Sequence, residues 1–524
     1  MDSNHIFRMR SLHLLVCIWL VATAQLFGKA NATLPEYNVF DFGARADTNY
    51  LSTAAFQSAI DSAFASGGGV IQVPSGSFKI GTIVLKSNVT LNLQEGSVVF
   101  ASPNINDYRA PFEHAKHPVL IYANGAQNIA ITGSGLIDGR AKHVYEPLRE
   151  IDSYIVNETE LAKQSGVEMS RYYIVPPDVN LITLFDCEKI QIENVSIQNS
   201  SFWTLHLLEC TDVKITGVTI NSSLEKGVNA DGIDLNLCRN VEIKQCTVRT
   251  GDDAIVIKSR ADQLTENIQV SDCVVASSSS ALKIGTESRG TIRQVVFQNC
   301  KVEDSNRGLS IVVLDGGTVS DVVFSNIDVE CSRRHFNWWG DGDPIHVRLS
   351  KRRSKSKMGK ISNIVFQNID AVGVGTSLIT SDTAGRIDNL QIKNVSLKMR
   401  PEKVPDMRAT DALAISGVRN LTLYEVKVSW QTDTSQPTWR HSLNLDHVSG
   451  VEIINSTSEN FHEQNDYSHL NIEASQDVRI ERFKSNISKV SSLSLLGSDK
   501  EVNHYQLDAS SAYQLLDFNL SELK

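Results

Sequence analysis

One short motif recurs along the chain at a nearly constant interval. The runs GIDL from Gly232, AIVI from Ala254, ALKI from Ala281 and GLSI from Gly308 begin 22, 27 and 27 residues apart. Alternation of apolar residues with others is typical of a strand that buries one face. A repeat of this length with a conserved register indicates a solenoid, in which each turn stacks on its neighbour.

A second pattern extends the repeat over most of the chain. A polar residue followed by alternating apolar residues recurs twelve times from Asn128 on, as in KIQIENVSI from Lys189 and NIVFQNIDA from Asn363. Turns of mostly 23 to 31 residues, each holding several short strands, predict an all-β fold, a single-stranded parallel β-helix. Leucine-rich repeats are excluded because no turn carries a helical segment.

An amphipathic stretch precedes the repeat. Residues Ala54, Phe56, Ile60 and Phe64 recur at roughly helical spacing within Thr53 to Ala65. We expect this helix to cap the N-terminal end of the solenoid, since an open apolar end would promote aggregation. No boundary interrupts the later turns, so residues 33–509 are predicted to form one β-helix domain, followed by a C-terminal tail over residues 510–524.

The first 32 residues have the layout of a secretory signal peptide. Arg8 and Arg10 precede an apolar run from Leu12 to Leu26 and then Ala30-Asn31-Ala32. A membrane anchor is the alternative interpretation of this run. With cleavage after Ala32 we expect a secreted or periplasmic protein with no membrane span. The net charge of −10 makes such a protein a poor candidate for nucleic-acid binding.

The cysteines follow the same period. Cys246, Cys273 and Cys300 are 27 residues apart and occupy the same place in successive turns. This spacing predicts a buried ladder of thiols, not a disulfide framework or a metal site.

Three aspartates gather at the start of two successive turns. If Ile233 and Ile255 point into the core, Asp231 and Asp253 are expected in one outward column, between Trp203 on one side and Ser280 and Arg307 on the other. A second column would hold Asp234, Val256, Lys283 and Ser310, with His206 one residue out of register. Adjacent strands lie about 4.8 Å apart, so Asp231, Asp252 and Asp253 would share one small patch. Such crowding costs stability and shifts pKa values, which favours a chemical use.

Paired carboxyl groups of this kind suit glycosidic bond hydrolysis. One carboxylic acid protonates the leaving oxygen while another carboxylate activates water, and crowding keeps one acid neutral beside ionised bases. Calcium binding is the main competing use of clustered aspartates. For Asp234 alone, a structural ladder of turn aspartates is an equal alternative.

A long interval between Asp321 and Asn363 marks an inserted loop. It contains Trp338 and Trp339, which either stack on sugar faces or pack the loop against the solenoid. The basic run Lys351 to Lys357 follows, and a solvated loop is its simpler interpretation.

Several motifs carry a resemblance to a known family. NADGID from Asn229, GDDAIVIKS from Gly251, SFWTLH from Ser201, and the earlier YNVFDFGA and SNVTLNL resemble glycoside hydrolase family 28, the polygalacturonase and rhamnogalacturonase family. The similarity covers essentially the whole chain after residue 32. It implies a right-handed parallel β-helix and hydrolysis with inversion. By the same resemblance Asp252 would be the general acid, and Asp231 and Asp253 would position and activate water.

Two family motifs are replaced. Ser279-Ser280-Ala281 stands where pectin-cleaving members have Gly-His-Gly, and Ser310-Ile311-Val312 stands in place of the Arg-Ile-Lys motif that grips the substrate carboxylate. Lys283 and Arg307 either replace the lost cations or only neutralise the aspartates; alternatively the subsite takes a neutral sugar. The remaining candidates for substrate binding are Asn229, Lys258, His206, Trp338 and Trp339.

The leading hypothesis is an exported, monomeric, inverting glycoside hydrolase without a cofactor, acting on a pectic or related acidic polysaccharide. A β-helix that binds polysaccharide without cleaving it, and a β-helix lyase or epimerase, are the alternatives.

Overall fold

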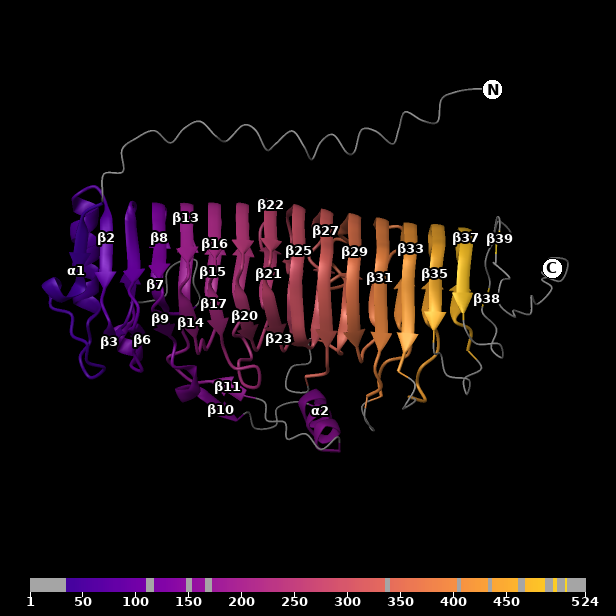
Figure 1. Ribbon diagram of the computed structural model, residues 1–524, viewed down its shortest axis with the longest axis horizontal. Coiled ribbons are helices and arrows are strands. Elements are labelled where there is room, and N and C mark those ends of the chain that lie inside the picture. The colour runs from indigo at the N-terminus through magenta and orange to yellow at the C-terminus, as the bar shows by residue number, and fades with distance from the viewer. Residues whose placement is uncertain are drawn as a thin grey trace, which may run out of the picture. The chain divides into compact units, whose positions relative to one another are not determined.

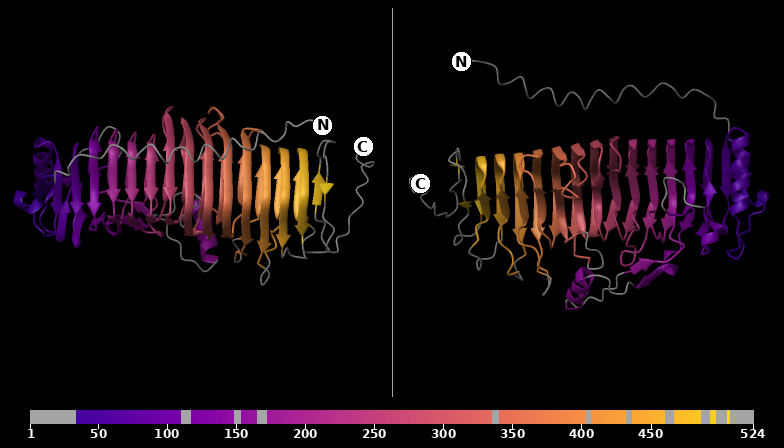
Figure 2. Two further views of the ribbon diagram at one scale, coloured as in Figure 1. Left: turned by 45° about the horizontal axis from the view of Figure 1, so that its top comes forward. Right: turned by 180° about the vertical axis from the view of Figure 1, so that it is seen from behind.

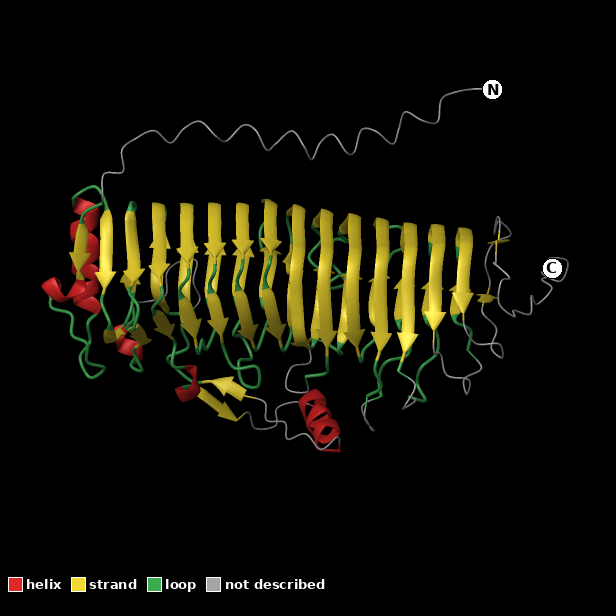
Figure 3. Ribbon diagram, in the orientation of Figure 1, coloured by secondary structure: helices red, strands yellow, loops and turns green. Residues whose placement is uncertain are grey.

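The structure is a computed structural model that describes residues 34–109, 117–147, 153–164, 172–334, 340–402, 407–431, 436–459, 467–485, 493–496 and 505–506. The predicted signal peptide and C-terminal tail lie outside these residues. From Glu36 on, the chain forms one unit in which strands stack turn upon turn (Figures 1 and 3). The fold is a right-handed parallel β-helix, as predicted.

Each turn adds one strand to a 14-stranded parallel sheet and one or two strands to a 23-stranded sheet. The 14-stranded sheet consists of β4 (Ile83–Val84), β7 (Val119–Asn124), β12 (Asn180–Phe185), β15 (Leu205–Leu208), β18 (Ile233–Asn236), β21 (Ile255–Ser259), β24 (Ser280–Ser288), β26 (Arg307–Val313), β28 (Asp343–Leu349), β30 (Ser377–Ser381), β32 (Leu413–Ser416), β34 (Leu443–Asp446), β36 (Leu470–Glu473) and β38 (Leu493–Leu496).

The 23-stranded sheet holds short paired strands in the early turns and single long strands from β25 on. It consists of β1 (Glu36–Asn38), β2 (Gly69–Val73), β3 (Gly76–Ile80), β5 (Val89–Leu93), β6 (Ser97–Ala101), β8 (Gln127–Gly133), β9 (Leu136–Asp138), β13 (Glu188–Glu193), β14 (Ser196–Gln198), β16 (Thr211–Thr216), β17 (Thr219–Asn221), β19 (Arg239–Lys244), β20 (Thr247–Thr250), β22 (Leu264–Ser271), β23 (Val274–Ser277), β25 (Thr291–Ser305), β27 (Thr318–Cys331), β29 (Lys360–Gly373), β31 (Ile387–Met399), β33 (Val418–Trp430), β35 (Ser449–Glu459), β37 (Gln476–Ser485) and β39 (Tyr505–Gln506).

The core is built from identical positions of successive turns. In the 14-stranded sheet the inward column reads Leu205, Ile233, Ile255, Leu282, Leu309 and Ile345, all fully buried. In the other sheet the rings of Phe297, Phe324 and Phe366 stack with centroids 4.8 and 5.0 Å apart. Like side chains pack on like because parallel in-register pairing brings each residue above its counterpart.

A helix caps the N-terminal end of this core, as predicted. Helix α1 (Thr53–Ala65) packs Phe56 against Phe78 of β3, with ring centroids 5.7 Å apart. The buried stripe is Ala55, Phe56, Ala59, Ile60 and Ala63. Two residues of the predicted stripe, Ala54 and Phe64, are exposed instead, because the true stripe is shifted by one residue at each end.

One insertion projects beyond an edge of the stacked strands (Figures 1 and 2). It contains β10 (Tyr145–Pro147) paired antiparallel with β11 (Tyr172–Ile174), and helix α2 (Ser153–Gln164). The Tyr145 hydroxyl donates to the carbonyl of Ser200 at 2.8 Å. This bond ties the pair to the turn that precedes β15. Three short 3₁₀ helices, η1 (Val39–Phe42), η2 (Ile105–Asp107) and η3 (Ala141–His143), lie in the N-terminal turns.

The thiols form ladders. Cys246, Cys273 and Cys300 are free and buried, in agreement with the predicted ladder. Cys187, Cys210 and Cys238 form a second such ladder, since the strands that follow them pair in register.

Asparagines fix the turns of the 23-stranded sheet. Asn240, Asn267, Asn363 and Asn389 all have φ between 55° and 57°, in the left-handed region that asparagine tolerates better than most residues. Their side chains also bond to one another from turn to turn. Asn240 donates to Asp212 and accepts from Asn267, both at 2.9 Å. The turn residue in front of each apolar run is therefore set by backbone conformation and by its neighbours.

We expect Asn240→Ala to lower the free energy of unfolding by about 1–2 kcal/mol, because alanine strains the left-handed backbone and removes two side-chain hydrogen bonds. Asn240→Gly removes the same bonds without the strain, so it should recover part of the loss. Urea unfolding followed by tryptophan fluorescence measures both. Equal destabilisation by alanine and glycine would contradict a backbone origin.

Candidate active site

The three predicted aspartates lie together on the outer face of the 14-stranded sheet. Asp231 precedes β18, and Asp252 and Asp253 precede β21. The Gly232 amide donates to the Asp253 carbonyl at 2.8 Å, so Asp231 and Asp253 occupy matching places in adjacent turns. Strict strand alternation from Ile233 would have turned Asp231 inward. It faces outward because Asp231 and Gly232 lie before the strand begins.

Two glycines allow the loops in front of these strands to approach closely. A Cβ atom at Gly251 would meet the carbonyl oxygens of Ser223 and Gly227 at 2.4 Å. A Cβ at Gly232 would meet the Ala254 carbonyl oxygen at 2.4 Å. The glycines of the NADGID and GDD motifs thus let backbone pack on backbone and hold the aspartates at the N-terminal ends of β18 and β21.

Lys258 of β21 joins two of the aspartates. Its Nζ lies 2.9 Å from Asp231 Oδ2 and also bonds Asp234 Oδ1, and all three side chains are buried. Burial, followed by the charge of Asp234, raises the pKa of Asp231 well above its usual range. Burial alone would lower the pKa of Lys258, but Asp231 and Asp234 raise it well above its usual value. Lys258 therefore stays charged.

Asp252 and Asp253 differ sharply in their partners. Asp253 Oδ2 lies 2.7 Å from Lys283 Nζ, and its Oδ1 accepts a 3.0 Å bond from Ser279 Oγ. Asp252 Oδ1 accepts from the backbone amide of Asp253 at 3.0 Å. Burial, followed by the charge of Asp253, raises the pKa of Asp252 to about 7. Asp253 is thus paired with a cation, whereas the adjacent Asp252 has a raised pKa.

The other predicted cation is held away from the acids. Arg307 Nε lies 3.0 Å from Asp343 Oδ2, and His346 Nδ1 lies 2.8 Å from the same oxygen. Ser280 lies one turn beyond Asp253, and Arg307 pairs in register with Ser280 in the turn after that. Arg307 therefore extends the row of charged side chains without touching Asp252 or Asp253.

An aromatic group borders the acids on the preceding turns. The Trp203 ring lies edge-on to His206 with centroids 4.7 Å apart, and Lys258 Nζ lies 4.3 Å above the Trp203 ring. Burial, followed by the charge of Arg260, lowers the pKa of His206 to about 3, so His206 is neutral. The predicted register was wrong for His206, which pairs directly with Asp234.

Arg260 and Glu287 lie next to Trp203 and Lys258. The Arg260 guanidinium lies 4.4 Å above the Trp203 ring and pairs with Glu287 at 3.2 Å. Burial would raise the pKa of Glu287, but Lys258 and Arg260 outweigh it and lower the pKa to about 2. Asn229 is exposed two residues before Asp231. Trp338 and Trp339 lie outside the described residues.

Buried polar atoms without a hydrogen-bond partner among the described residues gather on this face. They include His206 Nε2, Asp231 Oδ1, Asp234 Oδ2, Ser280 Oγ and Ser310 Oγ. Unsatisfied buried polar atoms cost free energy, so their concentration on one surface is typical of a site that binds a polar ligand.

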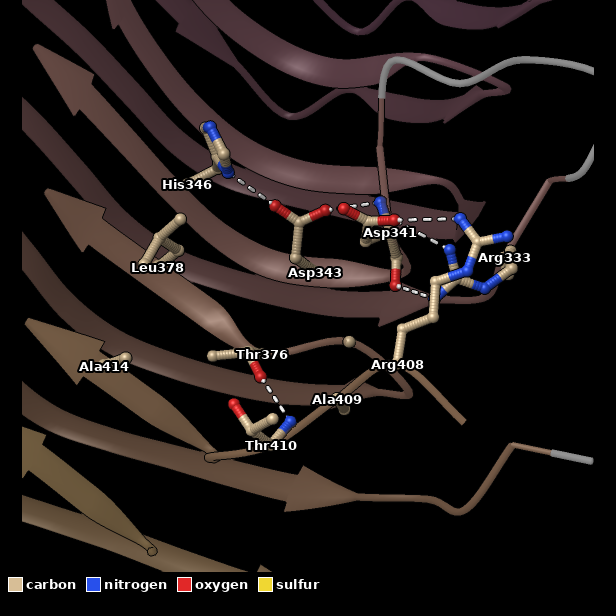
Figure 4. A pocket seen from close by; sticks show the side chains of 11 residues that line it. Arg333, Asp341, Asp343, His346, Thr376, Leu378, Arg408, Ala409, Thr410 and Ala414 are labelled. Atoms are coloured by element: carbon tan, nitrogen blue, oxygen red, sulfur yellow. Dashed lines mark hydrogen bonds and ion pairs between the residues drawn. The ribbon is translucent and has the colours of Figure 1, made fainter. Parts of the chain in front are cut away.

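A pocket of about 300 Å³ continues this face beyond Arg307 (Figure 4). Asp343, His346, Leu378 and Ala414 reach it from β28, β30 and β32. Loop residues complete its lining: Arg333, Asp341, Gly375, Thr376, Arg408, Ala409 and Thr410.

Sequence reasoning placed the three aspartates and Lys283 correctly in space, but it missed their partners. Ser279 stands out in the sequence only as part of a replaced motif, and no sequence pattern indicates Arg260, Asp343 or His346. Their side chains come from turns whose separation varies between 22 and 36 residues, so no fixed period points to them. Trp203 did carry a signal, because it falls in the same outward column as Asp231. The described residues contain no cluster of three His, Cys, Asp or Glu side chains suited to a metal ion.

Comparison with known proteins places the chain in a family. Residues 67–399 match the model of the glycosyl hydrolases family 28. A probable polygalacturonase of Vitis vinifera is 28% identical over 241 residues, which are 43% of this chain and 45% of that protein. An exo-poly-alpha-D-galacturonosidase of Dickeya chrysanthemi is 27% identical over 253 residues, covering 42% of this chain and 41% of that protein. The matched region thus spans less than half of either relative.

Solved structures show the same fold. The family 28 exopolygalacturonase of Yersinia enterocolitica superposes with a TM-score of 0.60 at 22% identity, over 82% of this chain and 79% of that one. A hyperthermoactive exopolygalacturonase from Thermotoga maritima gives a TM-score of 0.55 at 25% identity, over 74% and 91%. Because the family model matches more than half of the length of this chain, the chain belongs to the glycosyl hydrolases family 28.

Proposed function

We propose that the protein is an exported glycoside hydrolase that cleaves a pectic or related acidic polysaccharide with inversion at the anomeric carbon. The observation that carries this proposal is the contrast between two adjacent carboxyl groups: the pKa of Asp252 is raised to about 7, and Asp253 is paired with Lys283. Glycosidic hydrolysis needs this combination of a neutral acid and an ionised carboxylate. Family membership and relatives named as polygalacturonases support it.

In this proposal Asp252 protonates the glycosidic oxygen. Of the two remaining aspartates, Asp253 is assigned as the base for the attacking water, because Lys283 and Ser279 fix its carboxylate in place beside Asp252. Asp231 shares one ammonium group with Asp234 and favours its protonated form, so it positions the water instead. Water then attacks the anomeric carbon as the bond to the leaving oxygen breaks.

A basic loop supports an acidic polymer as the substrate. Lys351, Arg353, Lys355 and Lys357 are exposed in the turn after β28. Arg352 anchors this turn beside β24, since it pairs with Asp315 at 2.6 Å and donates to the Thr286 carbonyl at 3.3 Å. Thr286 directly precedes Glu287, so a cluster of positive charge borders the candidate site of a protein whose net charge is −10. Such local charge raises the encounter rate with polyanions.

Two other functions remain candidates. A β-helix that only binds polysaccharide would need no acid of raised pKa, which disfavours it. A lyase or epimerase would give an unsaturated or isomerised product instead of new reducing ends. No helix within the described residues has both the length and the apolar character needed to cross a membrane.

We expect Asp252→Asn to lower kcat by about 10²–10⁴-fold while leaving the thermal midpoint unchanged or raised, because the amide cannot donate a proton to the leaving oxygen. Release of reducing ends from pectic polysaccharides measures the effect. Asp262→Asn, at an exposed loop aspartate nearby, is the matched control and should keep full activity. Undiminished activity in Asp252→Asn would remove Asp252 as the acid.

The pH dependence of kcat should report the same group. Because the pKa of Asp252 is raised to about 7, the protonated, active form prevails below pH 7 and is lost as the pH rises above it. Well above pH 7, kcat should fall about tenfold per pH unit. A plateau in kcat extending to pH 9 would be incompatible with this assignment.

Replacing the four exposed cations of the basic loop with serine should raise KM for an acidic polymer roughly tenfold at low salt and leave kcat unchanged, since the loop acts on encounter. Added salt should raise KM of the unaltered protein and erase the difference. The control removes four exposed lysines from the 23-stranded sheet: Lys214, Lys360, Lys398 and Lys484. Equal KM values for the two variants would rule out steering by this loop.

A further inference from the structure

The cations beside the candidate acids are already matched by carboxylates of this chain. Lys258 contacts Asp231 and Asp234, and Lys283 contacts Asp253 at 2.7 Å. Arg260 and Arg307 contact Glu287 and Asp343, at 3.2 and 3.0 Å. These four cations face six carboxyl groups once Asp252 is included. A negatively charged sugar at the acids would add another carboxylate beside cations that already have carboxylate partners in the chain.

Geometry also separates one exposed cation of the 14-stranded sheet from the acids. Arg348 is exposed on β28, three strands beyond β21 in the order β21, β24, β26, β28. Strands are about 4.8 Å apart, so it lies about 14 Å from the strand that follows Asp253. It can meet a sugar further along the polymer, but not the sugar whose bond is cleaved.

In the adjoining pocket, too, arginines are paired with carboxylates of the chain (Figure 4). Arg333 pairs with Asp341 at 2.8 Å and with Glu402 at 3.1 Å, and Arg408 lies 3.7 Å from Asp341. Leu378 adds an apolar surface of the kind that packs on the C–H face of a sugar ring. This lining suits an uncharged sugar better than a uronate.

Resting on the proposed function, we propose that the sugar whose glycosidic bond is cleaved carries no charge: a neutral sugar, or a uronic acid whose carboxyl group is esterified. The polymer around it is acidic and is attracted by the basic loop, whereas the sugar over Asp252 and Asp253 meets cations, Lys258 and Lys283, that are paired with aspartates of the chain. The replacement of the Arg-Ile-Lys motif by Ser310-Ile311-Val312 agrees with this, because no counter-ion is then required.

The test compares polymers that differ in charge. The full chain is incubated with polygalacturonate, with its methyl-esterified and carboxyl-reduced forms, and with a rhamnogalacturonan backbone in which neutral and acidic sugars alternate. Mass spectrometry then identifies the sugar at each new reducing end. Release of neutral or esterified ends, with free polygalacturonate cleaved at least tenfold more slowly, is expected.

The outcomes separate the two proposals. Preferential cleavage of free polygalacturonate with release of free uronate ends would overturn the uncharged sugar and leave hydrolysis standing. Failure to cleave any of the four polymers, or formation of unsaturated ends, would overturn the proposed function and the inference with it.

A charge variant adds a second readout. Glu287→Gln removes the partner of Arg260, so the ratio of kcat/KM on free over esterified polymer should rise roughly tenfold. Activity on the esterified polymer shows that the variant is folded. Glu266→Gln, which breaks the pair with Arg293 on the 23-stranded sheet, is the control and should leave the ratio unchanged. An unchanged ratio in Glu287→Gln would contradict the inference.

Discussion

Parallel pairing in register, turn upon turn, is the constraint on which the rest of this structure depends. It places Ile233 beside Ile255 and Leu282, and it carries Asp231 and Asp253 to neighbouring places although 22 residues separate them. A slip of one residue would reverse every side chain between core and surface. The acids, their cations and the apolar core are therefore fixed together.

The candidate site departs from what stability alone would select. Buried charges lose hydration, and a buried ion pair rarely repays that loss compared with apolar residues of similar size. Here Asp231, Asp234 and Lys258 are buried together, and Asp253 is buried with Lys283. The surrounding solenoid supplies a long core that can carry such a cost, which is consistent with a chemical role for these groups.

The sequence predicted the fold because the repeat itself is the fold. Residues such as Asn240 and Asn267, each in front of an apolar run, mark the turns. The outward column from Asp231 to Arg307 also emerged from counting, since every turn there has a nearly constant length. The capping helix was predicted with the right bounds, but its buried stripe was misplaced, because a hydrophobic side chain such as Phe64 can remain exposed at a helix end.

The sequence does not predict which carboxylate each cation of the candidate site contacts. The sequence predicts Lys258 and Lys283 as possible ligands for substrate, whereas each is held by aspartates of the chain. Whether a long lysine side chain bends toward one carboxylate or another depends on local packing, which periodicity does not encode. The partner of Arg307 is Asp343, which follows an inserted loop and so falls outside the regular count.

The thiol ladders have a consequence for chemistry in the core. Neighbouring cysteines such as Cys246 and Cys273 stand about 4.8 Å apart with parallel side chains, whereas a disulfide needs Cβ atoms about 3.8 Å apart and directed toward each other. Joining them would therefore require the two side chains to turn toward each other and the stacked turns to shift. The buried thiols react with a thiol reagent only when adjacent turns separate. The rate of their modification therefore measures how often this part of the solenoid opens.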